Sequence, residues 1–133
     1  MSGILLDTHV WAWSLTDDAR LSVNGLAAIQ SPENIFLSPI SFFEIALKVK
    51  KGKWPEMQPF YSLLKETFLG QGGRFAPLDP EICVRAAGLE WSHRDPFDRM
   101  LAATALENRL SFVSADAAFD ALAEMKEWQG RVW

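Results

Sequence analysis

The segment Ile4-Leu5-Leu6-Asp7 decides how this sequence is interpreted. Its three apolar residues predict a short buried strand, and an acidic residue follows that strand directly. Three more acidic residues stand in apolar surroundings further along the chain: Glu44, Asp98 and Asp116. An ionised carboxylate is costly to bury unless it is paired or binds a metal ion. If the four carboxylates gather at one pocket, that pocket requires a cation.

Short apolar runs alternate with longer helical patterns over the rest of the chain. The predicted strands span residues 4–6, 34–37, 75–78 and 111–114. The predicted helices span residues 10–15, 21–29, 38–52, 59–69, 80–89, 96–108 and 117–125. Strands separated by helices of this length indicate right-handed crossovers and a mostly parallel sheet that is covered on both faces. The predicted fold class is α/β.

The composition bounds the class of protein. With 133 residues, 49% of them apolar, the chain is long enough for one core, and we expect a single domain over residues 1–133. One cysteine excludes an internal disulfide framework, and we find no leader and no long uncharged span, so a cytoplasmic protein without membrane contact is expected. A net charge of −4 argues against loose adhesion to nucleic acid, although a bound divalent ion can invert the local charge of an acidic cleft.

Asp7 and Asp116 each come directly after a predicted strand. Ligands of parallel sheets bind beyond the carboxyl ends of the strands, so these two side chains meet if their strands are neighbours. Each residue has an alternative role, because aspartate is also favoured as the N-cap of a helix.

Glu44 lies on a narrow polar stripe of the helix predicted over residues 38–52. At about 100° per residue, Ser41, Glu44, Lys48 and Lys51 share this stripe, while apolar side chains fill most of the remaining surface. Two structural alternatives stay open. Ser41 and Glu44 have the spacing of a capping box, and Glu44 and Lys48 form a favourable i, i+4 pair.

Asp98 falls on the same helical stripe as Leu101 and Ala105, so its side chain should point toward the sheet. Asp95 is the better N-cap candidate, since Pro96 then takes the favoured first helical position. Asp95 has an alternative role as a hydrogen-bonding support for Asp98.

Carboxylate oxygens are the ligands of hard ions, so Mg²⁺ is expected, with Mn²⁺ as a substitute. His9 and His93 lack the spacing of zinc ligands, and we expect structural hydrogen bonding from both more than contact with a substrate phosphate. Thr8 and Ser114 are candidates to hydrogen-bond the ligating carboxylates, or to cap helices. A metal ion in a carboxylate cluster suits phosphodiester hydrolysis.

Lysines gather between residues 48 and 53. Lys48 and Lys51, together with Arg99, are candidates to contact an RNA backbone. The alternative is that the lysines are simply favoured by the dipole at the C-terminus of a helix.

Four stretches resemble a PIN domain of the VapC toxin type. They are residues 5–11 (Leu-Leu-Asp-Thr-His-Val-Trp), 38–53, 93–99 (His-Arg-Asp-Pro-Phe-Asp-Arg) and 112–116 (Phe-Val-Ser-Ala-Asp). The resemblance covers almost the whole chain. One departure is Ser114, where the family often has threonine, a change that keeps the hydroxyl.

This resemblance implies a PIN-like three-layer α/β/α sandwich and Mg²⁺-dependent endoribonuclease activity. It also implies a homodimer and inhibition by a cognate antitoxin protein. The site residues that it implies are Asp7, Glu44, Asp98 and Asp116. A noncatalytic interaction module with the same fold remains an alternative, although such a module would not need all four acids.

Overall fold

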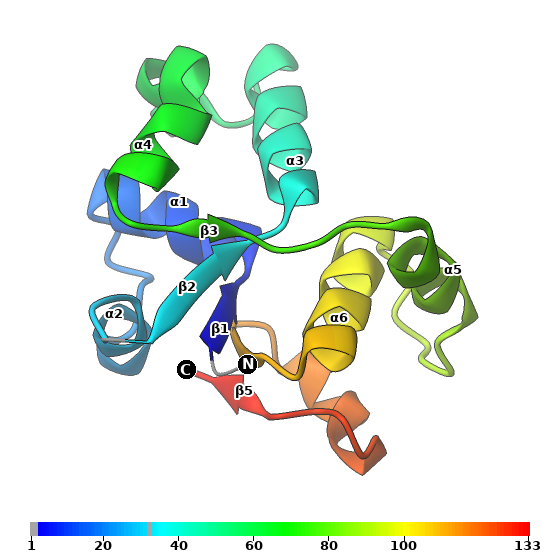
Figure 1. Ribbon diagram of the computed structural model, residues 1–133. Helices are drawn as coiled ribbons and strands as arrows, with labels where there is room; N and C mark the ends of the chain where they lie inside the picture. The colour runs from blue at the N-terminus through cyan, green and yellow to red at the C-terminus, as the bar shows by residue number, and fades with distance from the viewer. Residues whose placement is uncertain (1–2, 32) are drawn as a thin grey trace.

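The computed structural model describes residues 3–31 and 33–133 (Figure 1). The strands are β1 (Gly3–Leu6), β2 (Asn34–Leu37), β3 (Arg74–Phe75), β4 (Ser111–Val113) and β5 (Arg131–Val132). The α-helices are α1 (Thr8–Thr16), α2 (Val23–Ile29), α3 (Pro39–Lys50), α4 (Leu64–Gly70), α5 (Pro80–Gly88) and α6 (Pro96–Asn108). Two 3₁₀-helices are η1 (Pro55–Leu63) and η2 (Ala117–Glu124). Within these described residues, no helix combines the length and apolarity that crossing a membrane requires.

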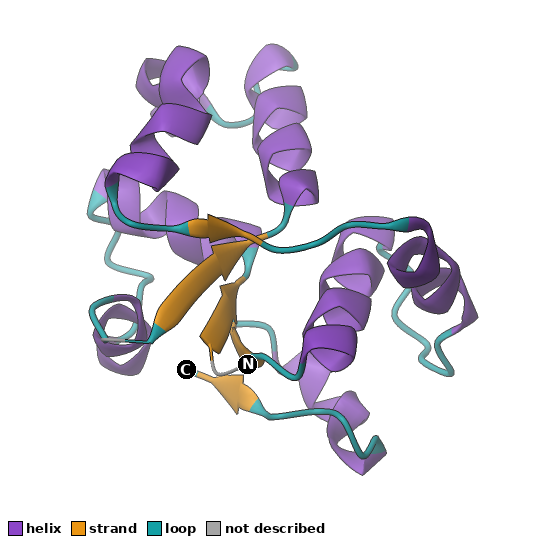
Figure 2. Cartoon of the chain, viewed as in Figure 1, coloured by secondary structure: helices purple, strands orange, loops and turns teal. Residues whose placement is uncertain are grey.

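The strands form one sheet in the order β3-β2-β1-β4-β5, and every neighbouring pair is parallel (Figure 2). Strand β1 is central, with Leu5 aligned to Phe36 of β2 and to Phe112 of β4. Because the strands are parallel, all their carboxyl ends lie at one edge of the sheet. Asp7 continues this edge, and its backbone N–H donates to the carbonyl oxygen of Val113 over 2.9 Å.

Side chains of the central strands alternate between two apolar layers. Ile4 and Leu6 face the layer that includes side chains of α1, α3, η1 and α4, while Leu5 faces the layer of α6 and η2. Figure 1 shows α5 and α6 on the opposite side of the sheet from α1, α2 and α4. Helices therefore cover both faces, which confirms the predicted α/β sandwich with a parallel sheet.

Several predicted boundaries are wrong. The third strand covers Arg74–Phe75 and not residues 75–78, and the helix predicted to reach residue 52 ends at Lys50. The helix predicted over residues 59–69 is instead the second half of the 3₁₀-helix η1 followed by α4. Pro55 and Pro59 lie in η1, and neither has the backbone N–H donor that an α-helical hydrogen-bond ladder needs. The last predicted helix is also 3₁₀, and β5 was not predicted.

Candidate metal centre

The four predicted acids line one pocket of about 470 Å³. Asp7 lies between β1 and α1, and Asp116 lies between β4 and η2. Glu44 comes from α3 and Asp98 from the first turn of α6. Parallel strand order thus brings together carboxylates from four distant parts of the chain, as expected from the sequence.

Asp7 is the most constrained of these acids. Only 8% of its surface is exposed, and the Ser114 hydroxyl donates to Asp7 Oδ2 over 2.7 Å. Burial raises the pKa of Asp7 to about 7, and the negative charges of Asp98 and Glu44 contribute to this rise. Asp7 occupies the N-cap position of α1, but its side chain makes no capping hydrogen bond. The capping alternative is therefore wrong for this residue.

Two fully buried hydroxyl groups, those of Ser114 and Thr8, form hydrogen bonds beside the acids. Ser114 Oγ also accepts from the backbone N–H of Asp116 over 3.0 Å, so Ser114 joins two of the acids. Thr8 behaves differently from the prediction, because its hydroxyl donates to Ser41 Oγ over 2.9 Å and not to a carboxylate. The Thr8 backbone N–H, next to the Asp7 carboxyl group, lowers the pKa of that group.

Glu44 is 5% exposed, and Lys48 Nζ lies 2.9 Å from its Oε2 atom. The predicted i, i+4 pair is thus confirmed. The capping box is wrong, because Ser41 lies inside α3 and Ser38 caps the helix by accepting from the backbone N–H of Ile40. Lys48 supplies a positive charge beside Glu44 within the pocket.

Asp98 forms a short contact that the sequence did not predict. His93 Nε2 lies 2.6 Å from Asp98 Oδ2. Burial raises the pKa of Asp98 to about 6, the hydrogen bond from His93 opposes this rise, and the charge of Asp95 adds to it. Asp95 caps α6 by accepting from the backbone N–H of Phe97 over 2.9 Å, so its N-cap role is confirmed.

Asp116 is exposed, and its side chain accepts from the backbone N–H of Ala118 over 2.9 Å, which caps η2. One ligand atom each from His93, Asp98 and Asp116 lies within 4.8 Å of the other two. The structural hydrogen bonding expected of His93 is thus confirmed by its contact with Asp98, whereas its place among candidate metal ligands was not predicted from the sequence. Its position five residues before Asp98 is the only sequence signal, and that spacing matches no familiar metal-ligand motif.

Arg99, a predicted RNA contact, does not line the acidic pocket. Its guanidinium donates all five of its N–H bonds to backbone carbonyls at distances between 2.7 and 3.2 Å. The acceptors are the carbonyl oxygens of Ala86, Ala87, Leu89, Trp91 and His93. These bonds leave no donor for a phosphate, so the prediction for Arg99 is corrected: it holds the segment between α5 and α6.

His9 lines the same pocket but packs against aromatic rings. Its ring centroid lies 4.9 Å from that of Trp54 and 5.9 Å from that of Trp13. Burial lowers the pKa of His9, and the charge of Lys48 lowers it further. His9 is thus part of the aromatic pocket wall, with its ring tilted against both tryptophan rings.

The donor set of the pocket fits a divalent cation. The pKa values of Asp7 and Asp98 are raised, so neighbouring cations do not offset the cost of burying these carboxyl groups. A divalent ion placed among the carboxylates offsets both their burial and their mutual repulsion. Carboxylate oxygens suit Mg²⁺ and Mn²⁺, which fits the expected class of ion.

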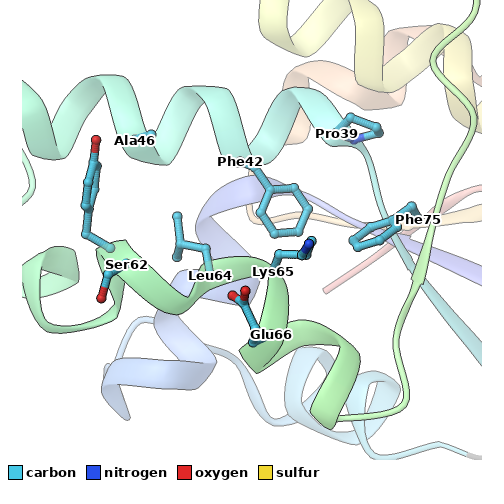
Figure 3. Close-up of a pocket in the computed structure, with 9 residues that line it drawn as sticks. Pro39, Phe42, Ala46, Ser62, Leu64, Lys65, Glu66 and Phe75 are labelled. Atoms are coloured by element: carbon cyan, nitrogen blue, oxygen red, sulfur yellow. The ribbon is translucent and has the colours of Figure 1, made fainter.

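A second cavity has the opposite chemistry. This apolar groove, of about 490 Å³, lies between α3 and the η1–α4 segment and includes Phe42, Leu64 and Phe75 in its lining. Figure 3 shows the Phe42 and Phe75 rings beside each other, and their centroids are 5.6 Å apart. None of the four acids lines this groove.

The parallel sheet and the acidic pocket at its carboxyl edge define an α/β protein with a carboxylate-rich candidate metal centre. More particularly, this chain belongs to the PIN domain family, because the PIN domain model matches residues 4–125, a range that contains all four acids. Ribonuclease VapC22 from Mycobacterium tuberculosis (strain ATCC 25618 / H37Rv) is 31% identical over 117 residues. The match covers 87% of this chain and 88% of that protein.

Solved structures share the fold. A chain in the crystal structure of VapBC2 from Rickettsia felis, bound to a DNA fragment from their promoter, superposes with a TM-score of 0.67. It is 12% identical, and the match covers 100% of both chains. A chain of FitAcB from Neisseria gonorrhoeae gives a TM-score of 0.56 at 23% identity, covering 90% of this chain and 93% of that one.

Proposed function

We propose that this chain is a metal-dependent endoribonuclease and the toxin of a toxin–antitoxin pair. The observation that carries the proposal is the convergence of Asp7, Glu44, Asp98 and Asp116 on one pocket of a PIN domain. The 31% identity to Ribonuclease VapC22 supports RNA as the substrate. A noncatalytic interaction module has no need for four converging carboxylates, three of them buried or half-buried at a cost in stability.

Asp7 and Asp98 are the principal metal ligands in this proposal, and Asp116 and Glu44 complete the set directly or through water. Mg²⁺ is the proposed ion, with Mn²⁺ as a substitute. When bound, the ion supplies a nucleophile at neutral pH and stabilises the charge of the phosphoryl transition state. Ser114 orients the Asp7 carboxylate, and Lys48 offsets the charge of Glu44.

Lys48 and Lys51 are proposed to contact the RNA backbone. Lys51 is exposed at the C-terminal end of α3, and the Lys48 side chain, 33% exposed, lies at the pocket. Both residues continue the polar side of α3 beyond Glu44, toward the C-terminal end of the helix. Such contacts place the negatively charged RNA beside a pocket that is itself acidic.

The proposed protein partners are a cognate antitoxin and a second copy of this chain, and the proposed location is the cytoplasm. Residues 1–133 are proposed to act as one domain. VapBC2, one of the proteins that share the fold, is seen bound to a promoter DNA fragment. Growth arrest on expression of this chain, relieved by Asp7→Asn, supports the toxin role. Arrest that persists in Asp7→Asn argues against a toxic nuclease. Light scattering measures whether the purified chain is a dimer.

Cleavage of total RNA by the purified protein tests the proposal directly. We expect cleavage with Mg²⁺, none with a chelator, and 5′-phosphate and 3′-hydroxyl ends when the cuts are mapped. Asp7→Asn should reduce cleavage by at least about a hundredfold, since metal stabilisation of a transition state contributes several kcal/mol. Glu66→Gln, in the apolar groove, is the matched control and should cleave normally. Equal cleavage by Asp7→Asn would refute the assignment.

A further inference from the structure

We infer that His93 is a direct ligand of the divalent ion, together with Asp98 and Asp116. The inference rests on the proposed function, because it takes the acidic pocket as the metal centre, and it changes the nature of that centre. A site with one imidazole nitrogen and several carboxylate oxygens favours a transition-metal ion such as Mn²⁺ over Mg²⁺, which prefers oxygen alone.

The candidate ligand atoms of His93, Asp98 and Asp116 lie close together. Neighbouring ligands of an octahedral ion, each about 2.1 Å from it, lie about 3 Å from one another. His93 Nε2 and Asp98 Oδ2 are 2.6 Å apart, so a small separation of the two side chains admits an ion between them. The Asp116 ligand atom lies within 4.8 Å of both, and its exposed carboxylate has a second oxygen besides the Oδ1 atom that caps η2.

The His93 imidazole is held in place by its surroundings. Its ring centroid lies 4.8 Å from that of Trp91 and 6.3 Å from that of Phe119. Its backbone carbonyl accepts a hydrogen bond of 2.9 Å from Arg99 Nη1. A ligand that is already oriented loses little conformational freedom on binding an ion. Arg99 therefore contributes to the site by positioning His93.

His9 provides an internal comparison. It lines the same pocket. Among the residues that the structure describes, however, the potential metal ligands that lie within 4.8 Å of one another include a ring nitrogen of His93 and none of His9. The full sequence contains these two histidines and no others. Any histidine nitrogen detected on a bound ion must therefore come from one of two residues, which single substitutions distinguish. The competing role for His93 is to orient Asp98 by a hydrogen bond without touching the ion.

Electron spin echo modulation of the Mn²⁺-loaded, full-length protein separates these roles, because it detects nitrogen bound directly to Mn²⁺. We expect the ¹⁴N signal of a coordinated imidazole in the wild-type protein and in His9→Gln, and its loss in His93→Gln. Labelling the wild-type protein with ¹⁵N-histidine should replace the ¹⁴N pattern with that of ¹⁵N, which needs no substitution. A Mn²⁺ complex without coordinated nitrogen, or a signal that survives in His93→Gln, would overturn the inference.

Calorimetric titration adds a second readout. His93→Gln should weaken Mn²⁺ binding at least about tenfold and Mg²⁺ binding less, which narrows the preference between the two ions. An equal loss for both ions would point to a merely structural role and would contradict the inference. If RNA cleavage depends on Mg²⁺ while bound Mn²⁺ carries no histidine nitrogen, this inference fails and the proposed function stands. If neither ion binds, both fail.

Discussion

Helix α3 separates two cavities of similar volume and opposite chemistry. The metal-centre pocket, of about 470 Å³, receives Glu44 and Lys48 from one side of the helix. The apolar groove, of about 490 Å³, receives Phe42 and Ala46 from the other side (Figure 3). One helix thus supplies buried charge to one cavity and aromatic surface to the other.

The two sides of α3 affect the stability of the fold in opposite ways. Beneath the groove, Phe68 packs its ring against those of Trp11 and Phe42, and such buried aromatic contacts stabilise the fold. In the pocket, burial raises the pKa of Asp7, which means that its ionised form destabilises the fold. Substitutions on the groove side should therefore lower the free energy of unfolding, and those on the pocket side should change metal binding and the dependence of stability on pH.

The largest expected effect is on the groove side. Phe68 is 1% exposed, so Phe68→Ala should lower the free energy of unfolding by about 3–5 kcal/mol through loss of burial and creation of a cavity. Urea denaturation at low temperature measures this loss, and the folded variant should still bind Mn²⁺ as the wild type does. Leu69→Ala is the matched control, since Leu69 is 46% exposed, and it should change stability far less. Equal losses in the two variants would break the comparison.

The next effect is a pH dependence on the pocket side. The pKa of Asp7 is raised from 3.8 to about 7 on folding, so protonated Asp7 contributes stability that is fully present below about pH 3.8 and is lost as the pH rises through 7. Without divalent ions, the stability of the wild type relative to Asp7→Asn should fall by about 2 kcal/mol between pH 5 and pH 7. Urea denaturation of both proteins measures the difference. A constant difference would show that Asp7 is not buried as described.

A smaller effect is expected from the hydroxyl that orients Asp7. Ser114→Ala removes the 2.7 Å hydrogen bond to the Asp7 carboxylate, and metal affinity should fall about tenfold. Ser114→Thr keeps the hydroxyl and should keep the affinity if the added methyl group fits. Calorimetric titration with Mn²⁺ measures both variants. Unchanged affinity in Ser114→Ala would mean that the carboxylate needs no support from this residue.

The sequence predicted those parts of the site whose signal is local. Asp7 and Asp116 follow apolar strands, and Glu44 and Asp98 stand on helices beside apolar residues, so each is conspicuous in the amino-acid sequence itself. Parallel strand order then brings them together. This part of the site needs only alternation, helical periodicity and the rule that parallel strands end at one edge.

The remaining parts depend on tertiary contacts that leave no periodic pattern. His93 reaches Asp98 because the segment between α5 and α6 is held by the Arg99 guanidinium, and neither contact follows from spacing. The same uncertainty in side-chain direction led to the wrong role for Arg99. Strand β5 has two residues, Arg131 and Val132, and it exists because β4 offers it an unpaired edge.

The smallest expected effect concerns the end of α3, where Lys51 continues the polar side of the helix. If Lys51 contacts a phosphate, Lys51→Ala should lower the slope of log binding constant against log salt concentration by about 0.7 for single-stranded RNA. Fluorescence anisotropy measures the slope, and every protein compared also carries Asp7→Asn to prevent cleavage. Lys65→Ala, on the groove side, is the matched control and should leave the slope unchanged. An unchanged slope for Lys51→Ala would assign this lysine to the helix dipole alone.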